Sequence, residues 1–351
     1  MAESRSFSIG TRKIGSDQPC FIIAEAGVNH NGQLVLAKKL VDAAKEAGAD
    51  AVKFQTFTAD TIAIESAPKA TYQKRSTTQE NQHEMLKKLE LSKNEFDELI
   101  RYCNEKKIIF LSSPFDEASV DLLEKIGVGA FKVGSGEITN TLLLEKVAKT
   151  KKPIIISTGM ATMDEIKEAV TFVTKKGNTS IALLHCISQY PTPLPQVNLQ
   201  CIGTLRNKFS VPIGFSDHTT SIIIPAAAVA LGACIIEKHL TLEKTMEGPD
   251  HLASLDPVEF KQMVRAIRDV EAAFGTGIKE PTTEEEEMKK IVRKSIVANT
   301  IIPKGTVLTH FHLAVKRPGT GLEPKRIDEL IGKKVNRLIK KDEFLSFDMV
   351  A

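Results

Sequence analysis

Residues 211–241 read VPIGFSDHTTSIIIPAAAVALGACIIEKHLT. Two short apolar runs in this stretch end in polar residues, FSDH at 215–218 and EKH at 237–239, and a helix-like segment separates them. A strand, a helix and a second strand form the repeating unit of a parallel sheet, whose strands all end at the same edge. We therefore expect His218 and His239 to lie close together at that edge.

The same rhythm repeats along the first three quarters of the chain. Eight apolar runs alternate with amphipathic segments such as 34–48 and 163–176, where apolar residues recur at helical spacing. The runs are 20–27 (CFIIAEAG), 51–57 (AVKFQTF), 108–115 (IIFLSSPF), 130–138 (AFKVGSGEI), 153–159 (PIIISTG), 180–188 (SIALLHCIS), 211–218 (VPIGFSDH) and 234–241 (CIIEKHLT). Eight such units over about 250 residues predict a closed (β/α)8 TIM barrel.

Composition and charge exclude several classes of protein. The 351 residues hold 47 Lys and Arg against 44 Asp and Glu, a net charge of +3, so no strong field favours nucleic acid or an anionic membrane. Residues 1–6 (MAESRS) lack the apolar core of a signal peptide, and no run reaches the ~20 apolar residues of a membrane span. The five cysteines form no Cys-x-x-Cys pair, which argues against a disulfide framework and a zinc knuckle. A cytoplasmic protein is expected.

A change of pattern near residue 280 predicts a second domain. Residues 279–287 (KEPTTEEEE) combine a charge run with Pro and Thr, which is typical of a solvated linker or a frayed helix start. Short strand-like pieces follow at 293–299, 304–308 and 313–317. We expect a barrel domain over 1–280, a linker over 281–291 and a small β-rich domain over 292–351.

Polar residues gather at the carboxyl ends of the expected strands, where the active site of a barrel lies. Lys53 and Lys132 lie inside apolar runs, where an unpaired lysine is costly. Each therefore needs an anionic partner, which is either a neighbouring carboxylate or a bound phosphate or carboxylate ligand. The turns at 134–137 (GSGE) and 157–159 (STG) combine glycine with hydroxyls and resemble anion cradles. Together with Ser216 they predict a pocket for a small phosphate ester.

Two histidines and two carboxylates supply further chemistry. Neutral imidazole suits divalent transition metals, and two His ligands leave open the coordination positions that a Lewis-acid catalyst needs. His218 and His239 are therefore candidate metal ligands. The loops after the first and eighth strands should face the same mouth, because those strands are neighbours in a closed barrel. Glu25 and Asp250 then become candidates for proton transfer, and either could be the group that activates water.

Taken in order, these motifs resemble the sialic acid synthase family. They are 25–32 (EAGVNHNG), 53–55 (KFQ), 113–116 (SPFD), 132–137 (KVGSGE), 157–160 (STGM), 190–193 (YPTP), 214–218 (GFSDH), 237–239 (EKH) and 248–251 (GPDH). The tail, with 293–295 (RKS) and 316–319 (KRPG), looks like the C-terminal antifreeze-like (SAF) domain of that family. The resemblance covers nearly the whole chain.

The resemblance implies an enzyme that condenses phosphoenolpyruvate with an N-acylated mannosamine and water, giving a nine-carbon 2-keto sugar acid and phosphate. The family uses a divalent metal, usually Mn²⁺ or Mg²⁺, which polarises the open-chain sugar aldehyde. The expected sugar is N-acetylmannosamine, which gives N-acetylneuraminate; the alternative is 2,4-diacetamido-2,4,6-trideoxymannose, which gives N,N'-diacetyllegionaminate. A non-enzymatic carbohydrate-binding protein is the alternative of another class, but binding alone needs no Lewis acid.

Carried over by position, the resemblance implies roles for individual residues. His218 and His239 hold the metal, and Glu25 stabilises the developing cation or takes the proton of water. The residues that grip phosphoenolpyruvate are Lys53, Lys132, Ser135, Ser157 with its neighbour Thr158, and Ser216. The residues that line the sugar side are Gln55, Glu137, Tyr190 and Asp250. Arg317 comes from the small domain of a partner subunit and contacts the N-acyl group, so a homodimer with exchanged C-terminal domains is expected.

Overall fold

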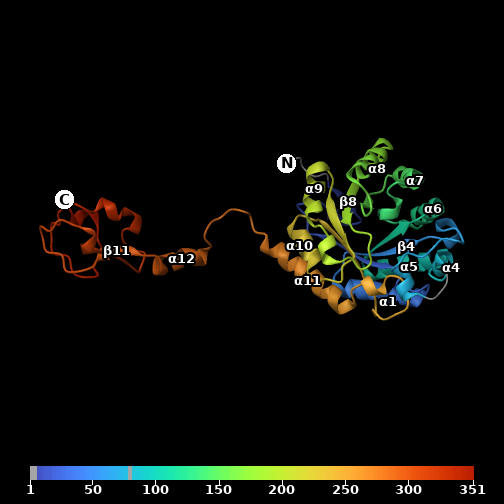
Figure 1. The fold of residues 1–351 in the computed structure, drawn as a ribbon, viewed down its shortest axis with the longest axis horizontal. Helices are drawn as coiled ribbons and strands as arrows, with labels where there is room; N and C mark the ends of the chain where they lie inside the picture. The colour runs from blue at the N-terminus through green and yellow to red at the C-terminus, as the bar shows by residue number, and fades with distance from the viewer. Residues whose placement is uncertain (1–5, 78–80) are drawn as a thin grey trace. The chain divides into compact units, whose positions relative to one another are not determined.

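Eight parallel strands form the centre of the first of two compact units, Met1–Phe274 and Gly275–Ala351 (Figure 1). The computed structural model describes residues 6–77 and 81–351. Residues 1–6 were expected not to form a signal peptide. Residues 1–5 of this segment lie outside the described residues. The boundary between the units falls a few residues before the predicted one at 280.

The strands follow the predicted runs closely. They are β3 (Phe21–Gly27), β4 (Ala51–Thr56), β5 (Ile109–Pro114), β6 (Phe131–Val133), β7 (Ile154–Ser157), β8 (Ile181–Cys186), β9 (Ile213–Asp217) and β10 (Ile235–His239). Their order is β5-β4-β3-β10-β9-β8-β7-β6, every hydrogen-bonded pair is parallel, and β5 and β6 at the two ends are also in contact. Each strand lies within one predicted run, and the contact between β5 and β6 closes the sheet. The predicted eight-stranded barrel is therefore confirmed.

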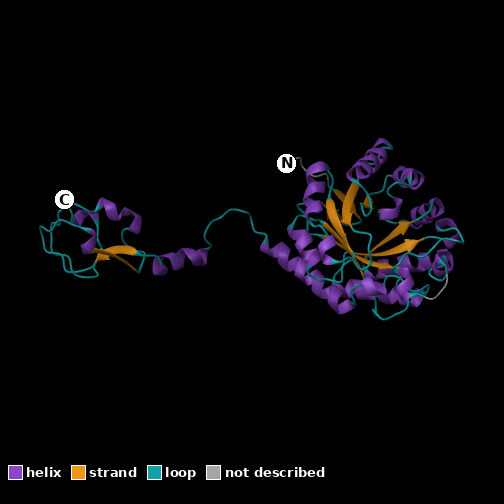
Figure 2. Cartoon of the chain, viewed as in Figure 1, coloured by secondary structure: helices purple, strands orange, loops and turns teal. Residues whose placement is uncertain are grey.

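Helices surround the strands on the outside (Figure 2). They are α1 (Leu34–Ala47), α2 (Ala59–Ile62), α3 (Gln73–Ser76), α4 (Gln82–Lys87), α5 (Lys93–Lys106), α6 (Glu117–Ile126), α7 (Thr141–Lys149), α8 (Met163–Lys175), α9 (Gln200–Lys208), α10 (Ile224–Ala230) and α11 (Pro257–Ala273), with short 3₁₀ helices η1 (Ser135–Glu137), η2 (Leu194–Gln196) and η3 (His251–Ala253). Capping boxes begin α5, α8 and α11. Gly48 and Gly127 end α1 and α6 in the left-handed conformation, with φ of 87° and 88°. None of the described helices combines the length and apolarity that a membrane span needs.

Alternate side chains of each strand enter two different cores, because successive residues of a strand point to opposite faces. Outward residues such as Ile22 and Val52 pack with the helices. Inward residues near the amino ends form a separate cluster, completed by a hairpin that the sequence did not predict, β1 (Phe7–Ile9) and β2 (Arg12–Ile14). The inner cluster holds Ile9, Ile14, Phe21, Ile23, Ala51, Leu111, Ala130, Ile155, Ala182, Leu184, Cys234 and Ile235.

The next inward positions toward the carboxyl ends are polar. Each lies two residues after a member of the inner apolar cluster: Glu25 after Ile23, Lys53 after Ala51, Ser113 after Leu111, Lys132 after Ala130, Ser157 after Ile155 and Glu237 after Ile235. The barrel interior therefore has an apolar layer at its amino end and a polar layer at its carboxyl end. The second layer positions the site.

The second unit is a small fold with its own core. It contains α12 (Thr283–Val292), which occupies the predicted linker, the antiparallel strands β11 (Ser295–Ala298) and β12 (Leu313–Lys316), and the 3₁₀ helices η4 (His310–His312), η5 (Pro324–Glu329) and η6 (Phe347–Met349). Its buried core includes Ile296, Leu308 and Ile339. The run 304–308, predicted to be strand-like, has one isolated bridge at Val307, because a turn at Gly305 interrupts it.

Candidate active site

A cavity of about 400 Å³ lies at the carboxyl ends of the barrel strands. Most of the site residues predicted from the sequence line it. They are Glu25, Lys53, Gln55, Lys132, Ser135, Ser157, Tyr190, Ser216, His218, His239 and Asp250. Since these residues come from strands or loops throughout the barrel, its closure is what brings them together.

Three predicted site residues are placed elsewhere. Thr158 follows Ser157 directly, so it has the opposite orientation, and its hydroxyl donates to the Leu184 carbonyl at 2.9 Å. Glu137 accepts a hydrogen bond from the Asn140 side chain at 2.7 Å. Arg317 follows β12 in the second unit, where its side chain is exposed. The predicted contacts of these residues with substrate stay predictions.

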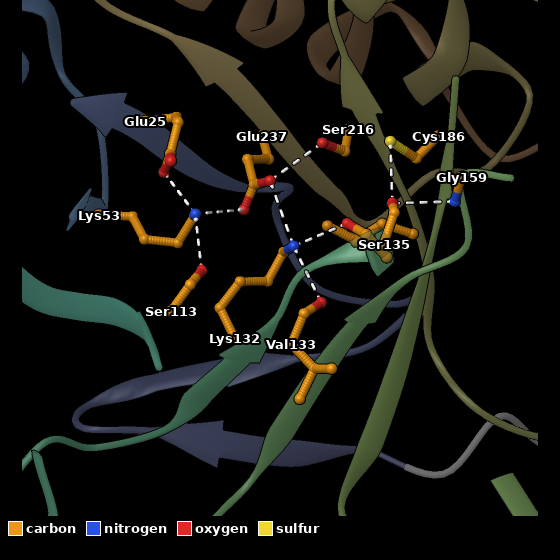
Figure 3. A network of polar contacts seen from close by, with 12 residues as sticks. Glu25, Lys53, Ser113, Lys132, Val133, Ser135, Gly159, Cys186, Ser216 and Glu237 are labelled. Atoms are coloured by element: carbon orange, nitrogen blue, oxygen red, sulfur yellow. Dashed lines mark hydrogen bonds and ion pairs between the residues drawn. The ribbon is translucent and has the colours of Figure 1, made fainter. Parts of the chain in front are cut away.

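Lys53 lies at the floor of the cavity between two carboxylates (Figure 3). Its Nζ is 2.5 Å from Glu25 Oε2 and 3.8 Å from Glu237 Oε2, and it donates to Ser113 Oγ at 3.1 Å. Lys53, Glu25 and Glu237 are each at most 5% exposed. Of the two partners that the sequence left open for Lys53, the structure therefore shows the neighbouring carboxylate.

Lys132 approaches the same carboxylate from the other side (Figure 3). Its Nζ is 3.5 Å from Glu237 Oε1 and donates to Ser157 Oγ at 2.7 Å. Glu237 Oε1 also accepts a hydrogen bond from Ser216 Oγ at 2.9 Å. Two buried lysines thus share one carboxylate, and an anion that enters beside them can supply the charge that Glu237 provides to both.

The four buried charges shift one another's ionisation. Burial raises the pKa of Glu25 to about 7, although Lys53 acts in the opposite direction. Burial also works against ionised Glu237, but Lys132 and Lys53 outweigh it and lower the Glu237 pKa. The pKa of Lys53 is raised because Glu237 and Glu25 outweigh its burial, whereas burial lowers the pKa of Lys132. Glu25 is therefore the carboxyl group of this cluster that can exchange a proton near neutral pH.

Two hydroxyl-rich turns, after β6 and after β7, lie at the cavity near Lys132. The Gly159 amide donates to Ser135 Oγ at 3.0 Å, and Ser135 Oγ lies 3.5 Å from Cys186 Sγ (Figure 3). A Cβ at position 159 would come within 2.3 Å of Ser188 Oγ. Glycine at this position therefore keeps space open beside two hydroxyl groups, and the anion cradle stays a prediction.

The two predicted metal ligands lie side by side, with ring centroids 5.4 Å apart. His218 Nδ1 is 2.6 Å from the Ile187 carbonyl, which can only accept, so Nδ1 donates and Nε2 is directed elsewhere. His239 Nδ1 is buried without a hydrogen-bond partner among the described residues. Burial lowers the pKa of His239 well below its usual value, which keeps this imidazole neutral and able to bind a metal.

The donor set at the two histidines fits a catalytic divalent ion better than a structural one. Among the described residues there is no group of three or more His, Cys, Asp and Glu side chains that could hold a metal. Two imidazoles would leave positions for water or a substrate oxygen. Burial works to lower the pKa of His218, but Cys186 and the Ile187 carbonyl outweigh it and raise the pKa.

The loops after β3 and β10 meet at the mouth of the barrel, as predicted. The side-chain amide of Asn29 donates to Ser254 Oγ at 2.9 Å, and Ser254 Oγ donates to the backbone carbonyl of Asp250 at 2.7 Å. His251 Nε2 lies 3.2 Å from Asn31 Oδ1. This network positions Asp250, and burial raises the pKa of its side chain to about 6.

Tyr190 was predicted to line the cavity, but the residues that the segment after β4 contributes were not. Tyr190 packs on His218 with ring centroids 4.1 Å apart, and Tyr72 stacks on Tyr190 at 4.8 Å. Further cavity residues from the segment after β4 are Ile62, Gln73, Gln82, Met85, Leu86 and Leu89. This segment consists of loops and very short helices, so no periodicity or motif pointed to it.

Other residues of the cavity were missed although a signal was present. Ser113, Cys186 and Glu237 also line it. Each lies two residues after a member of the inner apolar cluster, so alternation along its strand could have placed it among the site residues.

Known proteins resemble this chain over most of its length. The NeuB family matches residues 40–279 and the SAF domain matches residues 293–351. The chain is 47% identical over 332 residues to the N,N'-diacetyllegionaminic acid synthase of Legionella pneumophila, covering 93% of each chain. It is 40% identical over 341 residues to the N-acetylneuraminate-9-phosphate synthase of Homo sapiens, covering 97% of this chain and 95% of that relative. The crystal structure of the N-acetylneuraminic acid synthetase from Leptospira borgpetersenii, in complex with citrate, superimposes with a TM-score of 0.73 at 38% identity, over 81% of this chain and 95% of that one.

Proposed function

The chain belongs to the NeuB family and carries a C-terminal SAF domain, and on this premise we propose that it joins phosphoenolpyruvate to 2,4-diacetamido-2,4,6-trideoxymannose. As a member of this family it is a phosphoenolpyruvate-dependent synthase of a sugar acid. The proposal concerns the sugar, the residues that bind each substrate, the metal and the assembly.

The observation that carries the proposal is the pair of buried lysines that share Glu237 at the cavity floor. Lys132 and Ser157 already form a donor pair, and the turns that contain Ser135 and Gly159 lie close by and are joined by a hydrogen bond. A phosphate with two negative charges and an adjacent carboxylate matches two cations better than Glu237 alone does. We assign this end of the cavity to phosphoenolpyruvate.

The residues present can carry out the required steps. Carbon 3 of phosphoenolpyruvate attacks the aldehyde carbon, and the aldehyde oxygen takes up a proton as it becomes a hydroxyl group. Water adds to carbon 2, where positive charge develops, and loses one proton. The bond from carbon 2 to the phosphate oxygen then breaks as the remaining hydroxyl proton leaves and the 2-keto group forms. Glu25 accepts the proton of water, since its pKa of about 7 allows it to ionise at neutral pH, and Lys53 and Lys132 stabilise the departing phosphate. A divalent ion, Mn²⁺ or Mg²⁺, held by His218 and His239 would supply Lewis-acid polarisation of the aldehyde oxygen.

The proposed sugar replaces N-acetylmannosamine, the sugar expected from the sequence. Ile62, Met85, Leu86 and Leu89 pack in one apolar cluster that forms part of the cavity wall, which suits a deoxy methyl group better than a hydroxyl group. Gln73 and Gln82 lie in the same wall, where their amides could bond a second acetamido group. The 47% identity to a legionaminic acid synthase supports the same choice. N-acetylmannosamine remains the second candidate because of the 40% identity to the human relative.

Phosphate release distinguishes the candidates. The full-length protein is incubated with phosphoenolpyruvate and either sugar, with Mn²⁺, with Mg²⁺ or with a chelator. We expect the highest kcat/KM with the diacetamido sugar and no turnover with the chelator. Turnover of N-acetylmannosamine alone would contradict the assigned sugar, and no phosphate release under any condition would favour the non-enzymatic alternative.

We also propose that the enzyme is a homodimer in which the tail of one subunit completes the site of its partner. Arg317 is exposed, and α12 exposes the apolar side chains Met288 and Ile291 by 55% and 65%, a surface that a second copy would bury. A guanidinium fits the carbonyl of an N-acyl group. Mixing inactive Arg317→Ala subunits with inactive Lys53→Met subunits tests this, because one site of a mixed dimer contains neither change. Recovered activity supports the exchange, whereas continued inactivity after proven subunit exchange rules it out.

A further inference from the structure

A fully buried polar cluster lies on the outer face of β9 and β10, away from the cavity. It consists of Asp217, Thr219 and Lys238, whose relative exposure is at most 1%. Lys238 Nζ is 2.6 Å from Asp217 Oδ2. Along their strands, Asp217 and Lys238 alternate with inward residues of the site, so their side chains point toward the helices.

Every donor of the cluster is satisfied within it. The Lys238 ammonium donates to Asp217 Oδ2, to the Thr219 carbonyl and, at 3.4 Å, to Thr219 Oγ1. Asp217 Oδ1 accepts from the Thr219 amide at 2.8 Å, and Asp217 Oδ2 accepts from the Thr219 hydroxyl at 3.1 Å. The chain is therefore held on both sides of position 218, and one lysine ties that turn to β10.

Stability alone is a weak reason for such a cluster. A buried ion pair can often be replaced by apolar groups of similar volume at no cost, because desolvation offsets the attraction. What sets this pair apart is its place in the sheet. Asp217 and Lys238 are register partners, the β9–β10 ladder ends at this pair, and His218 and His239 are the next residues of the two strands.

We propose that Asp217, Thr219 and Lys238 form a positioning cluster that holds the His218 and His239 imidazoles at the separation at which they bind one divalent cation. The inference rests on the metal assignment made above for the two histidines. Beyond the last ladder pair, backbone hydrogen bonds no longer join the two strands, and the lysine replaces them with three side-chain contacts. Groups that orient metal ligands in this way commonly change metal affinity by about 10–100-fold.

The test measures Mn²⁺ affinity by calorimetry on the full-length protein without substrates. In the double variant Asp217→Asn and Lys238→Met, Asn retains the acceptor for the Thr219 amide while the link between the strands is lost. We expect Mn²⁺ to bind about 10–100-fold more weakly, with a melting temperature close to that of the unmodified protein. Unchanged Mn²⁺ affinity overturns the proposal.

The same barrel offers a matched control. Thr56 and Ser112 form an outward-facing, buried polar pair between β4 and β5, with their hydroxyl oxygens 2.6 Å apart. Neither residue flanks a histidine. The double variant Thr56→Val and Ser112→Ala should bind Mn²⁺ as the unmodified protein does; an equal loss there would mean that any buried polar pair affects the ion, which rejects a specific positioning role.

Three further variants keep the result decisive. If the Asp217→Asn and Lys238→Met variant fails to fold, Thr219→Val replaces it, because this change keeps the ion pair and removes one hydrogen-bond partner of Lys238. Thr219→Val should weaken Mn²⁺ binding by about threefold to tenfold. Unchanged binding rejects the proposal. His218→Ala and His239→Ala should each lose Mn²⁺ binding. Normal binding by both would overturn the metal assignment itself, whereas loss in these two with normal binding in the cluster variants rejects only the positioning role.

Discussion

The two ends of the barrel interior are built by the same strands, yet they contain opposite kinds of residue. At the amino end Ala51 and Ile155 face an apolar cluster that the β1–β2 hairpin completes. Two residues further along the same strands, Lys53 and Ser157 face the cavity. Burial of the apolar end stabilises the fold, whereas burial of charges at the polar end costs free energy that only a functional role explains. One end of the barrel therefore supplies the stability on which the other end depends.

The largest expected effect is at the polar end. His218→Ala should lower kcat/KM by about 10³-fold or more, because one of two proposed metal ligands is lost and the aldehyde is no longer polarised. Phosphate release measures this, and circular dichroism should show an unchanged fold. A chelator should abolish turnover of the unmodified enzyme, and Mn²⁺ or Mg²⁺ should restore it. Full activity of the variant in metal-free buffer would remove the metal from the mechanism.

At the apolar end the expected effect is on stability. Leu111→Ala opens a cavity in the inner cluster and should lower the free energy of unfolding by about 2–5 kcal/mol, as measured by urea denaturation. The kcat/KM of the folded enzyme should stay within about twofold of its original value, since Leu111 does not reach the cavity lining. Lost activity with unchanged stability would contradict the division of the interior into two ends.

A lysine variant tests whether charge at the polar end serves the ligand or the fold. Lys132→Met removes a charge-assisted contact worth about 1.5–3 kcal/mol, so the KM for phosphoenolpyruvate should rise about 10–100-fold while the KM for the sugar changes little. Thermal stability should fall only slightly, because Glu237 keeps Lys53 and the Ser216 hydroxyl as partners. Lys53→Met is the matched comparison, since it leaves Glu25 without its partner at 2.5 Å and should be less stable. Collapse of the Lys132 variant with unchanged affinity would assign this lysine to the fold.

The smallest expected effect is on the pH profile. A base must be ionised, and the pKa of Glu25 is raised to about 7, so kcat/KM should fall as pH decreases through about 7 and be about tenfold lower at pH 6. If Asp250 were the base, the fall would begin near its pKa of about 6. Glu25→Gln should abolish the pH dependence in the first case, and Asp250→Asn should do so in the second.

Much of the barrel could be predicted because its pattern is local. Each of the eight apolar runs contains a strand, and the helices at 34–48 and 163–176 lie where helical spacing placed them. The β1–β2 hairpin was missed because each of its strands has three residues, too few to show alternation. Tyr72 was missed for a different reason. It reaches the site from an irregular segment, and only packing against Tyr190 brings it there.

The residue types at the carboxyl ends of the strands can be read from the chain alone. They predict a polar site with two lysines and two histidines. Alternation along a strand also determines which side chains share one face, because it depends only on neighbouring residues. Which residues pair within the site depends on the tertiary structure. Lys53 pairs with Glu25, and Lys53 and Lys132 share Glu237, although these residues are far apart in the chain. Closure of the barrel brings their strands around one centre, and the resulting burial, which no local pattern encodes, determines how each charge is compensated.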